Sequence, residues 1–262
     1  MASKTQRRRE QIVARAAETG LASVDDLAQH FQVTASTIRR DLALLSRSGQ
    51  LARTYGGAMA PGHQTETSLL QREQEGFEAK TAIARWAADQ VQPEESILLD
   101  AGSTVALLAR RLPTLEGVTV TTASMPVMSM LRSRQDLSLV SLGGRLRELS
   151  DAFVGPLTEQ SLERLTFDRL FLGTDGVSTD GSICEAELDQ TRLKDLMARR
   201  SRQVYVLAHS TKLGRAPFHS WARLDHPWTL VTDEGADPKF LDTFRATGHQ
   251  VVLAPAAGAP DQ

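Results

Sequence analysis

The sequence predicts an α/β protein in two parts, a small helical unit followed by a larger domain with a mainly parallel sheet. Within residues 1–58, three helical segments with apolar faces precede one short strand-like run. From residue 77 to residue 257, apolar strand-like runs alternate with helical segments, which is typical of a parallel sheet covered by helices. The stretch 59–76 opens with a polar run containing Pro and Gly, and we interpret it as a linker.

Charge divides the chain at the same place. Residues 1–60 carry nine Lys and Arg against five Asp and Glu, whereas the remaining residues carry 21 against 27. A basic first part on an acidic second part favours a nucleic-acid-binding module joined to a domain with another role. The single cysteine, Cys184, excludes an internal disulfide and argues against a Cys-based metal cluster. We expect neither a metal site nor a cofactor.

The first two helices have clear apolar faces. The segment Arg7–Glu18 is the first helix, and its apolar residues are Ile12, Val13 and Ala16. Ser23 can cap the second helix, with Asp26 three residues further on as an acidic partner. The inner face of this helix carries Val24, Leu27 and Phe31.

The basic start of the chain, Lys4–Glu10, is either a phosphate-contacting arm or a solvated helix start. No apolar segment of the kind found in signal peptides follows it, and no apolar run approaches the roughly 18 residues that a membrane span needs. We therefore expect a cytoplasmic protein without membrane contact.

The third helix has the features of a DNA-recognition helix. Thr34 is a suitable N-cap, and Ile38, Leu42 and Leu45 form one apolar face. Off that face lie two short hydroxyl side chains and two arginines, which suit insertion into the major groove because Arg can grip guanine and hydroxyls can bond phosphates or base edges. Those four residues are Ser36, Thr37, Arg39 and Arg40.

A short β-wing is predicted after the third helix. Gly49 can end the helix, the run 51–55 can form a strand, and Gly56–Gly57 can turn it back. This order of elements is the outline of a winged helix-turn-helix, although a small helical bundle with a basic solvated face is the alternative. The candidate contacts to double-stranded operator DNA are Thr34, Ser36, Thr37, Arg39, Arg40, Arg53 and Tyr55.

The larger domain is expected to contain seven strands and several helices. The strand-like runs are Ser96–Leu99, Val118–Thr121, Leu137–Leu142, Leu170–Gly173, Gln203–Ala208, Thr229–Thr232 and Gln250–Leu253. The helical segments are Ala79–Val91, Thr104–Leu112, Pro126–Ser133, Leu188–Arg200 and Pro238–Thr247.

The segment Asp100–Thr104 carries the clearest chemical signal of this domain. It follows an apolar strand and opens a helix, and ligands of open α/β sheets bind at the carboxyl ends of strands. The free amides of a helix N-terminus suit a phosphate, and Gly102 lets the backbone approach it. A capped helix after a strand is the alternative explanation.

Further loop signals follow other strands. Gly143–Gly144–Arg145, Gly173–Gly176 and Lys212 each come after a strand-like run. They are either plain turns or parts of a shared ligand rim, and their repeated position after strands favours the rim.

Both parts resemble the DeoR family of bacterial sugar-catabolism regulators. In the first part the resemblance rests on Ser36–Leu42, Gly49–Leu51 and Tyr55–Ala58. In the second part, motifs in family order extend from Lys80–Ala84 through the Asp100–Thr104 loop to Ser210–Gly214. The resemblance implies a Rossmann-like sensor domain, similar in fold to ribose-5-phosphate isomerase and coenzyme A transferases.

The resemblance also implies a phosphorylated sugar as effector. The candidate effector-binding residues are Asp100, Gly102, Ser103, Thr104, Ser124, Gly143, Gly144, Arg145, Asp175, Lys194 and Lys212. One position departs from the family, because Ala123 stands where the family usually has Asn. A polar contact to the effector is therefore missing from the expected set.

These features predict a repressor of a sugar-catabolism operon, acting as a homodimer or homotetramer whose operator binding a sugar phosphate modulates. The chief alternative is an isomerase-like enzyme acting on a sugar phosphate, because the second part holds groups for proton abstraction and phosphate binding. Those groups are Asp100, Asp175, Glu185, Glu187, Lys194 and Lys212. A regulator that senses a partner protein or a free sugar is a further alternative.

Overall fold

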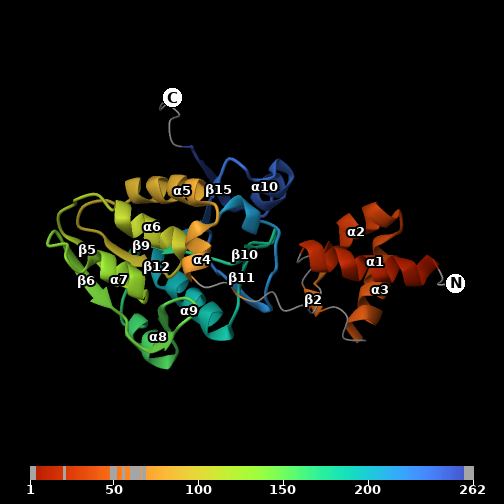
Figure 1. The fold of residues 1–262 in the computed structure, drawn as a ribbon, viewed down its shortest axis with the longest axis horizontal. Helices are drawn as coiled ribbons and strands as arrows, with labels where there is room; N and C mark the ends of the chain where they lie inside the picture. The colour runs from red at the N-terminus through yellow and green to blue at the C-terminus, as the bar shows by residue number, and fades with distance from the viewer. Residues whose placement is uncertain are drawn as a thin grey trace. The chain divides into compact units, whose positions relative to one another are not determined.

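The computed structural model describes residues 4–19, 22–47, 52–54, 57–59, 66 and 69–256. The chain divides into two compact units, which we call the head and the body (Figure 1). The head comprises residues 1–65, with the short segment 214–218 grouped with it, and the body comprises the rest. Each unit is described by itself.

Three helices form the core of the head. They are α1 (Lys4–Thr19), α2 (Val24–Phe31) and α3 (Ala35–Arg47). Ile38, Leu42 and Leu45 of α3 are buried against Ile12 and Leu27, which confirms the predicted apolar face.

Both predicted helix caps are present. The Ser23 hydroxyl accepts the Asp26 amide at 3.1 Å, and the Thr34 hydroxyl accepts the Thr37 amide at 3.3 Å. These bonds satisfy amides that would otherwise lack partners at each helix start.

A three-stranded antiparallel sheet completes the head. Its strands are β1 (Ala22–Ser23), β2 (Ala52–Thr54) and β3 (Gly57–Met59), in the order β1-β3-β2. The predicted wing is therefore a β-hairpin that pairs with the residues preceding α2. Tyr55 and Gly49 lie outside the described residues, and only the backbone of Arg53 is described.

A buried carboxylate connects the basic start of the chain to α3. Asp41 of α3 accepts a hydrogen bond from Arg8 Nε at 2.7 Å and another from Arg9 Nε at 2.8 Å. Its side chain is only 3% exposed, whereas the two arginines are partly exposed. Both arginines are therefore fixed on α3, so this part of α1 is not a simply solvated helix start.

The body is built on a seven-stranded sheet in which every pair is parallel. In spatial order the strands are β15 (Gln250–Ala254), β14 (Thr229–Asp233), β12 (Ser201–Leu207), β9 (Phe167–Leu172), β4 (Ser96–Leu99), β5 (Val118–Thr122) and β6 (Leu137–Ser141). All seven predicted strand-like runs are confirmed. The chain order reverses direction between β4 and β9, which is the doubly wound arrangement and marks the place where such sheets bind ligands.

Helices cover both faces of this sheet (Figure 1). On one face lie α5 (Phe77–Asp89), α6 (Ser103–Arg111) and α7 (Met125–Leu131), packed on Ile97, Leu99 and Phe171. The opposite face, with Leu98 and Leu170, packs on α8 (Pro156–Leu162), α9 (Leu188–Arg199) and α10 (Pro238–Arg245). Adjacent strand residues point to opposite faces, so strands buried on both sides appear as continuous apolar runs.

Several short elements were not predicted. They are α8, the hairpin of β7 (Arg145–Arg147) and β8 (Ala152–Val154), the 3₁₀ turn Ser210–Lys212, and a small antiparallel sheet of β10 (Gly176–Val177), β11 (Ser182–Glu185) and β13 (Ser220–Arg223). Most are two to four residues long, which is too short for hydrophobic periodicity to reveal.

The predicted linker 59–76 needs correction because it contains a helix, α4 (Leu69–Gln74). Leu69 is buried, and the body begins at Glu66 rather than at Phe77. The sequence did not indicate that α4 belongs to the body, because the preceding residues 59–67 are polar. Its Arg72 is also held by an ion pair with Asp175, and such a contact leaves no apolar pattern in the sequence.

Candidate functional site

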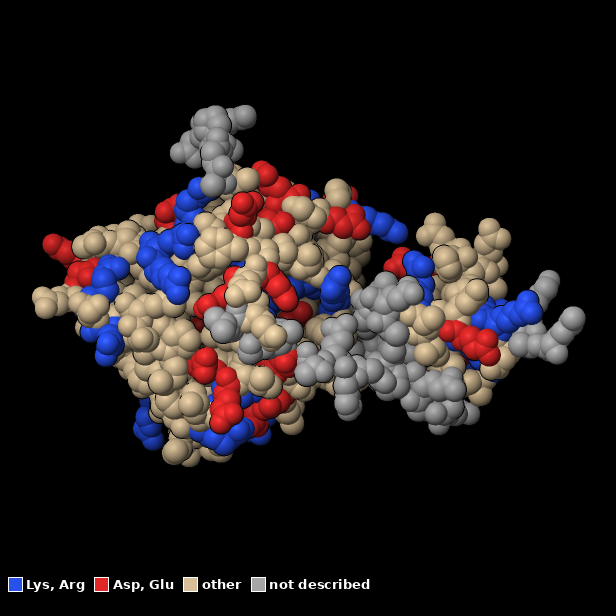
Figure 2. All heavy atoms as spheres, in the orientation of Figure 1, with Lys and Arg blue, Asp and Glu red and all other residues tan. Residues whose placement is uncertain are grey.

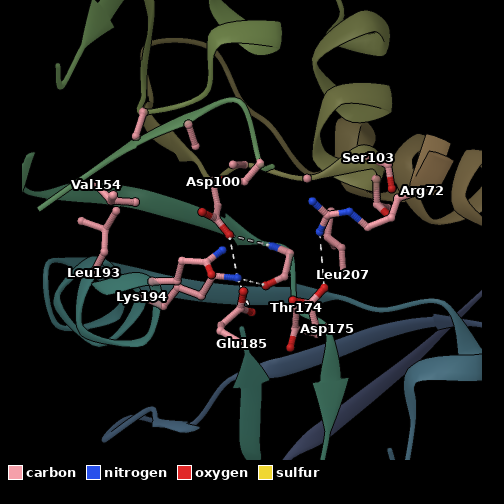
Figure 3. Close-up of a pocket in the computed structure, with 18 of the residues that line it drawn as sticks. Arg72, Asp100, Ser103, Val154, Thr174, Asp175, Glu185, Leu193, Lys194 and Leu207 are labelled. Carbon is pink, nitrogen blue, oxygen red and sulfur yellow. Dashed lines mark hydrogen bonds and ion pairs between the residues drawn. The ribbon is translucent and has the colours of Figure 1, made fainter. Parts of the chain in front are cut away.

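A cavity opens at the point where the strand order reverses. It lies at the carboxyl ends of β4, β5 and β9 and beside the start of α6, and its empty space, including the part open to solvent, is about 670 Å³ (Figure 3). Seven predicted effector residues line it: Asp100, Gly102, Ser103, Thr104, Asp175, Lys194 and Lys212.

The loop Asp100–Thr104 presents hydrogen-bond donors to the cavity. Gly102 has φ of 139°, a backbone conformation that glycine adopts far more readily than other residues. The helix α6 starts directly after it, so the first amides of the helix have no partner within the helix. Among the residues that the structure describes, the hydroxyls of Ser103 and Thr104 have no hydrogen-bond partner either.

Asp100 joins the two central strands across the reversal. Its Oδ2 accepts the Gly173 amide at 3.1 Å and lies 3.2 Å from Lys194 Nζ. The Lys194 ammonium also donates to the Gly173 carbonyl at 2.7 Å and to Glu185 Oε1 at 2.5 Å (Figure 3). A Cβ at Gly173 would stand 2.9 Å from the Ala101 carbonyl oxygen, so this close approach requires glycine.

Burial and charge act in opposite directions on this cluster. Burial raises the pKa of the Glu185 carboxyl above its ordinary value, because Lys194 only partly offsets the loss of solvent. Burial alone lowers the pKa of Lys194, but the carboxylates of Asp100 and Glu185 outweigh it, and the net pKa is raised. Lys194 is therefore a charged internal clamp whose ammonium is already shared between two carboxyl groups.

Lys212 differs from Lys194 in its partners. Its Nζ donates to the Thr174 carbonyl at 2.5 Å, and no described carboxylate lies within ion-pair distance of it. Burial lowers the pKa of Lys212 from its ordinary value. Of the cations lining the described part of the cavity, it is the one whose charge is not already paired.

Arg72 and Glu185 are cavity residues that the sequence analysis did not include in the effector set. Arg72 lies on α4 and directs its guanidinium towards Asp175, with Nη1 at 3.4 Å from Oδ1 (Figure 3). It was missed because its segment was interpreted as linker. Glu185 was considered only for the enzyme alternative, because no periodicity marks the four-residue strand that buries it.

Four predicted effector residues do not line the cavity: Ser124, Gly143, Gly144 and Arg145. Ser124 caps α7 by accepting the Val127 amide at 3.4 Å. The Arg145 side chain is 61% exposed and pairs with Asp189 at 2.9 Å, so its charge faces a neighbouring helix. Ala123, at the position that departs from the family, does line the cavity and contributes only a methyl group there.

The predicted DNA-contacting residues of α3 are mostly accessible. Arg39, Arg40, Ser36 and Thr34 are exposed, and Thr37 is half-buried. The Thr34 hydroxyl lies 3.0 Å from that of Ser36 and 2.9 Å from that of Thr37, so it is hydrogen-bonded to both of them. The two arginines are thus the groups most available to a phosphate or base.

Surface charge on the body is mixed. Figure 2 shows acidic and basic side chains interspersed over the visible face of the body. Within the described residues, no group of His, Cys, Asp and Glu has the arrangement of a metal site. No described helix is long and apolar enough to cross a membrane.

Two family models together match most of the chain. The DeoR C terminal sensor domain matches residues 75–234, and the DeoR-like helix-turn-helix domain matches residues 8–64.

Curated relatives match almost end to end. The putative aga operon transcriptional repressor of Escherichia coli O157:H7 is 32% identical over 95% of this chain and 94% of its own length. The uncharacterized HTH-type transcriptional regulator YulB of Bacillus subtilis is 36% identical over 88% and 90%, respectively. The glycerol-3-phosphate regulon repressor of E. coli K12 is 29% identical over 95% and 98%.

Among solved structures, ribose 5-phosphate isomerase from Plasmodium falciparum is 20% identical over 51% of this chain and 52% of its own, with a TM-score of 0.37. The predicted α/β class rests on the strand order of the body and not on this weak similarity.

We expect Lys194→Met to destabilise the body in a pH-dependent way. The substitution leaves Asp100 and Glu185 buried without their cation, at a cost of about 3–5 kcal/mol near neutral pH. Without Lys194, burial raises the folded-state pKa of the Glu185 carboxyl still further above its unfolded value, because the cation that partly offsets burial is gone. Between the unfolded-state and folded-state pKa values, the folded variant binds more protons than the unfolded chain. Its free energy of unfolding therefore falls as the pH rises.

Urea unfolding measured between about pH 5 and about pH 8 tests this expectation. The deficit of Lys194→Met should shrink towards the acid end, whereas Arg202→Met, at an exposed position of β12, should show little deficit at any pH. A deficit of constant size across the range would contradict the assigned clamp.

Proposed function

The chain belongs to the DeoR family of transcriptional regulators, and we propose that it represses a sugar-catabolism operon until a phosphorylated sugar lowers its affinity for the operator. Family membership makes it a regulator and not an enzyme. The observation that supports the effector class is the arrangement at the start of α6: in the described part of the chain, donors without partners lie in the same cavity as a lysine without an ion pair.

The chemistry of the cavity suits a phosphate. The amides of the first α6 turn and the hydroxyls of Ser103 and Thr104 supply donors, and the helix dipole is positive at this end. Lys212 adds a formal charge, and hydrogen bonds to charged groups are stronger than neutral ones. Asp175 and Asp100 supply acceptors that suit the hydroxyl groups of a sugar.

The same geometry argues against isomerase-like chemistry. The groups that would transfer protons, Asp100, Glu185 and Lys194, bond one another inside the body. A general base must accept a proton from the substrate carbon, but the Lys194 ammonium has no lone pair, and Glu185 and Asp100 each hold this ammonium inside the body. A sensor needs only the donors that remain unpaired.

The DNA-binding part of the proposal uses the exposed face of α3. Ile38 and Leu42 are buried in the core of the head, whereas Arg39 and Arg40 are exposed to solvent on the other side of the helix. A recognition helix of this kind enters the major groove, and a wing adds phosphate contacts. We place the protein in the cytoplasm, where an operator and a sugar phosphate are both accessible.

Loss of the two arginines should weaken operator binding and reduce sequence preference. Each bidentate base contact contributes about 1–3 kcal/mol. Duplexes selected from a random library by the full chain provide the DNA probe, and gel-shift titration of Arg39→Ala and Arg40→Ala measures the loss. Arg202→Ala, exposed on the body, is the matched control. Wild-type affinity in both arginine variants would remove α3 from the interface.

A sugar-phosphate screen tests the cavity. Because a ligand that binds only the folded state raises the melting temperature, we expect one of ribose 5-phosphate, fructose 6-phosphate, N-acetylglucosamine 6-phosphate or glycerol 3-phosphate to do so. The unphosphorylated counterparts should give no shift. Lys212→Met should lower affinity for the active compound by about 10- to 100-fold, since a charged hydrogen bond contributes about 1.5–3 kcal/mol.

Thr104→Val should also weaken binding, because it removes one hydroxyl without changing the side-chain shape. Thr243→Val is its control, since that hydroxyl lies at an exposed position of α10 and donates to the Lys239 carbonyl. Equal shifts with sugars and sugar phosphates would instead favour a free-sugar sensor.

The functional form should be a homodimer or homotetramer that binds repeated half-sites. A single winged helix contacts too few base pairs to select one site in a genome, and two-fold assemblies double the contacted length. Light scattering of the full chain with and without operator measures the assembly. A monomer under both conditions would refute this prediction.

A further inference from the structure

The first described residue of the body is a buried carboxylate. The Glu66 side chain is 7% exposed, and Arg147 of β7 binds it through two hydrogen bonds. One of these joins Arg147 Nη1 to Glu66 Oε1 at 2.9 Å, and the other joins Nη2 to Oε2. Arg147 is itself only 4% exposed. A buried pair of this geometry holds its backbone strongly, because separating the partners leaves a charge without solvent or counter-charge.

Arg72 connects Glu66 to the cavity. Its Nη2 lies 3.6 Å from Glu66 Oε1 and donates to the Leu149 carbonyl at 3.0 Å, while Nη1 reaches Asp175 at 3.4 Å. Arg72 therefore divides its charge between a carboxylate in the cavity and a carboxylate at the start of the body.

This shared arginine is incompletely satisfied. Among the described residues, Arg72 Nε and Asp175 Oδ2 are both buried without a hydrogen-bond partner. Unpaired buried polar atoms are costly, so a ligand that supplies an acceptor for Arg72 and a hydroxyl for Asp175 would gain from both. The contacts of Arg72 with Glu66 and Asp175 are also longer than those of Arg147 with Glu66, so Arg72 is the partner that is easier to move.

We propose that Glu66 is a positioning residue that links effector binding to the head. An anionic effector draws the Arg72 guanidinium into the cavity and weakens its pairing with Glu66. Glu66 matters because the chain from the head joins the body at this residue. Its anchoring therefore differs between the free and the liganded body, which is the differential interaction that coupling between two sites requires. This inference rests on the proposed effector-binding function of the cavity.

The neighbouring Glu187 provides a matched control. It binds Arg147 Nε at 3.1 Å, is 46% exposed, and has no ion pair with Arg72. Glu187→Gln therefore removes a carboxylate from Arg147 while leaving the connection from the cavity to Glu66 intact. Its side chain also caps α9 by accepting a backbone amide, and glutamine can still accept that bond.

The test compares wild type, Glu66→Gln and Glu187→Gln as full chains. Thermal melting without ligand verifies folding, and calorimetry measures affinity for each of the four sugar phosphates named above. Gel shift with the selected duplex then gives DNA affinity with and without a saturating concentration of each compound. The ratio of the two DNA affinities is the coupling factor, which ranges from about 5 to 150 in known allosteric systems.

Glu66→Gln should bind the active sugar phosphate and the unliganded duplex like wild type, but with a coupling factor below about 2. Glu187→Gln should keep the wild-type factor. Glu66→Asp keeps the charge but shortens the side chain, so it should give an intermediate coupling factor. This variant replaces Glu66→Gln in the test if Glu66→Gln does not fold.

Three outcomes would overturn the proposal. A wild-type coupling factor in Glu66→Gln, or in Glu66→Asp if only that variant folds, shows that the anchor does not carry the signal. An equal loss in Glu187→Gln assigns the effect to Arg147 in general. If the wild-type chain binds none of the four compounds, the proposed effector class fails and the inference fails with it. This result differs from the first outcome, in which the Glu66 variant binds the compound and its coupling factor is that of wild type.

Discussion

The pairing of Asp100 with Lys194 and Gly173 is the interaction on which the rest of the body depends. The two strands on either side of the sheet reversal, β4 and β9, end side by side there, and their last residues must leave in different directions. Asp100 closes that junction by accepting one amide and one ammonium, while Lys194 returns a bond to the Gly173 carbonyl. The space left between the diverging segments is the cavity. A binding site at this position is thus a geometric consequence of the strand order.

Charge balance decides what that cavity can do. Its described cations are Arg72, Lys194 and Lys212, and its described carboxyl groups are Asp100, Asp175 and Glu185. Two of the cations are paired internally, which lets charged groups remain buried at tolerable cost. Only Lys212 and the donors at the start of α6 remain free of such partners within the described residues. In a sensor, the tightly paired Lys194 holds the shape of the site, while the unpaired donors and the incompletely bonded Arg72 and Asp175 are available to a ligand.

The head uses the same principle on a smaller scale. Asp41 lies on the recognition helix but faces inward, where it fixes Arg8 and Arg9 of α1. The neighbouring Arg39 and Arg40 face outward without such partners in the described contacts and can serve DNA. On this one helix, the charged residue on the buried face therefore has a structural role, and those on the exposed face are available to DNA. In the body the corresponding structural pair is Glu66 with Arg147, at the residue where the chain arrives from the head.

By itself, the sequence determined the order and class of the elements. The seven strands of the main sheet were predictable because strands buried on both faces are continuous apolar runs, and α3 was predictable because its apolar residues repeat at helical spacing. The Asp100–Thr104 loop followed from its position between a strand and a helix. Only the tertiary structure decided which charges meet. Glu66 and Arg72 lie in a segment whose composition resembles a linker, and Arg147 is 81 residues away from Glu66 in the chain. Lys194 and Arg145 both looked like cations for an effector, yet one is an internal clamp and the other faces Asp189. Long-range ion pairs leave no periodicity in a sequence, because they depend on where distant elements come to lie and not on local spacing.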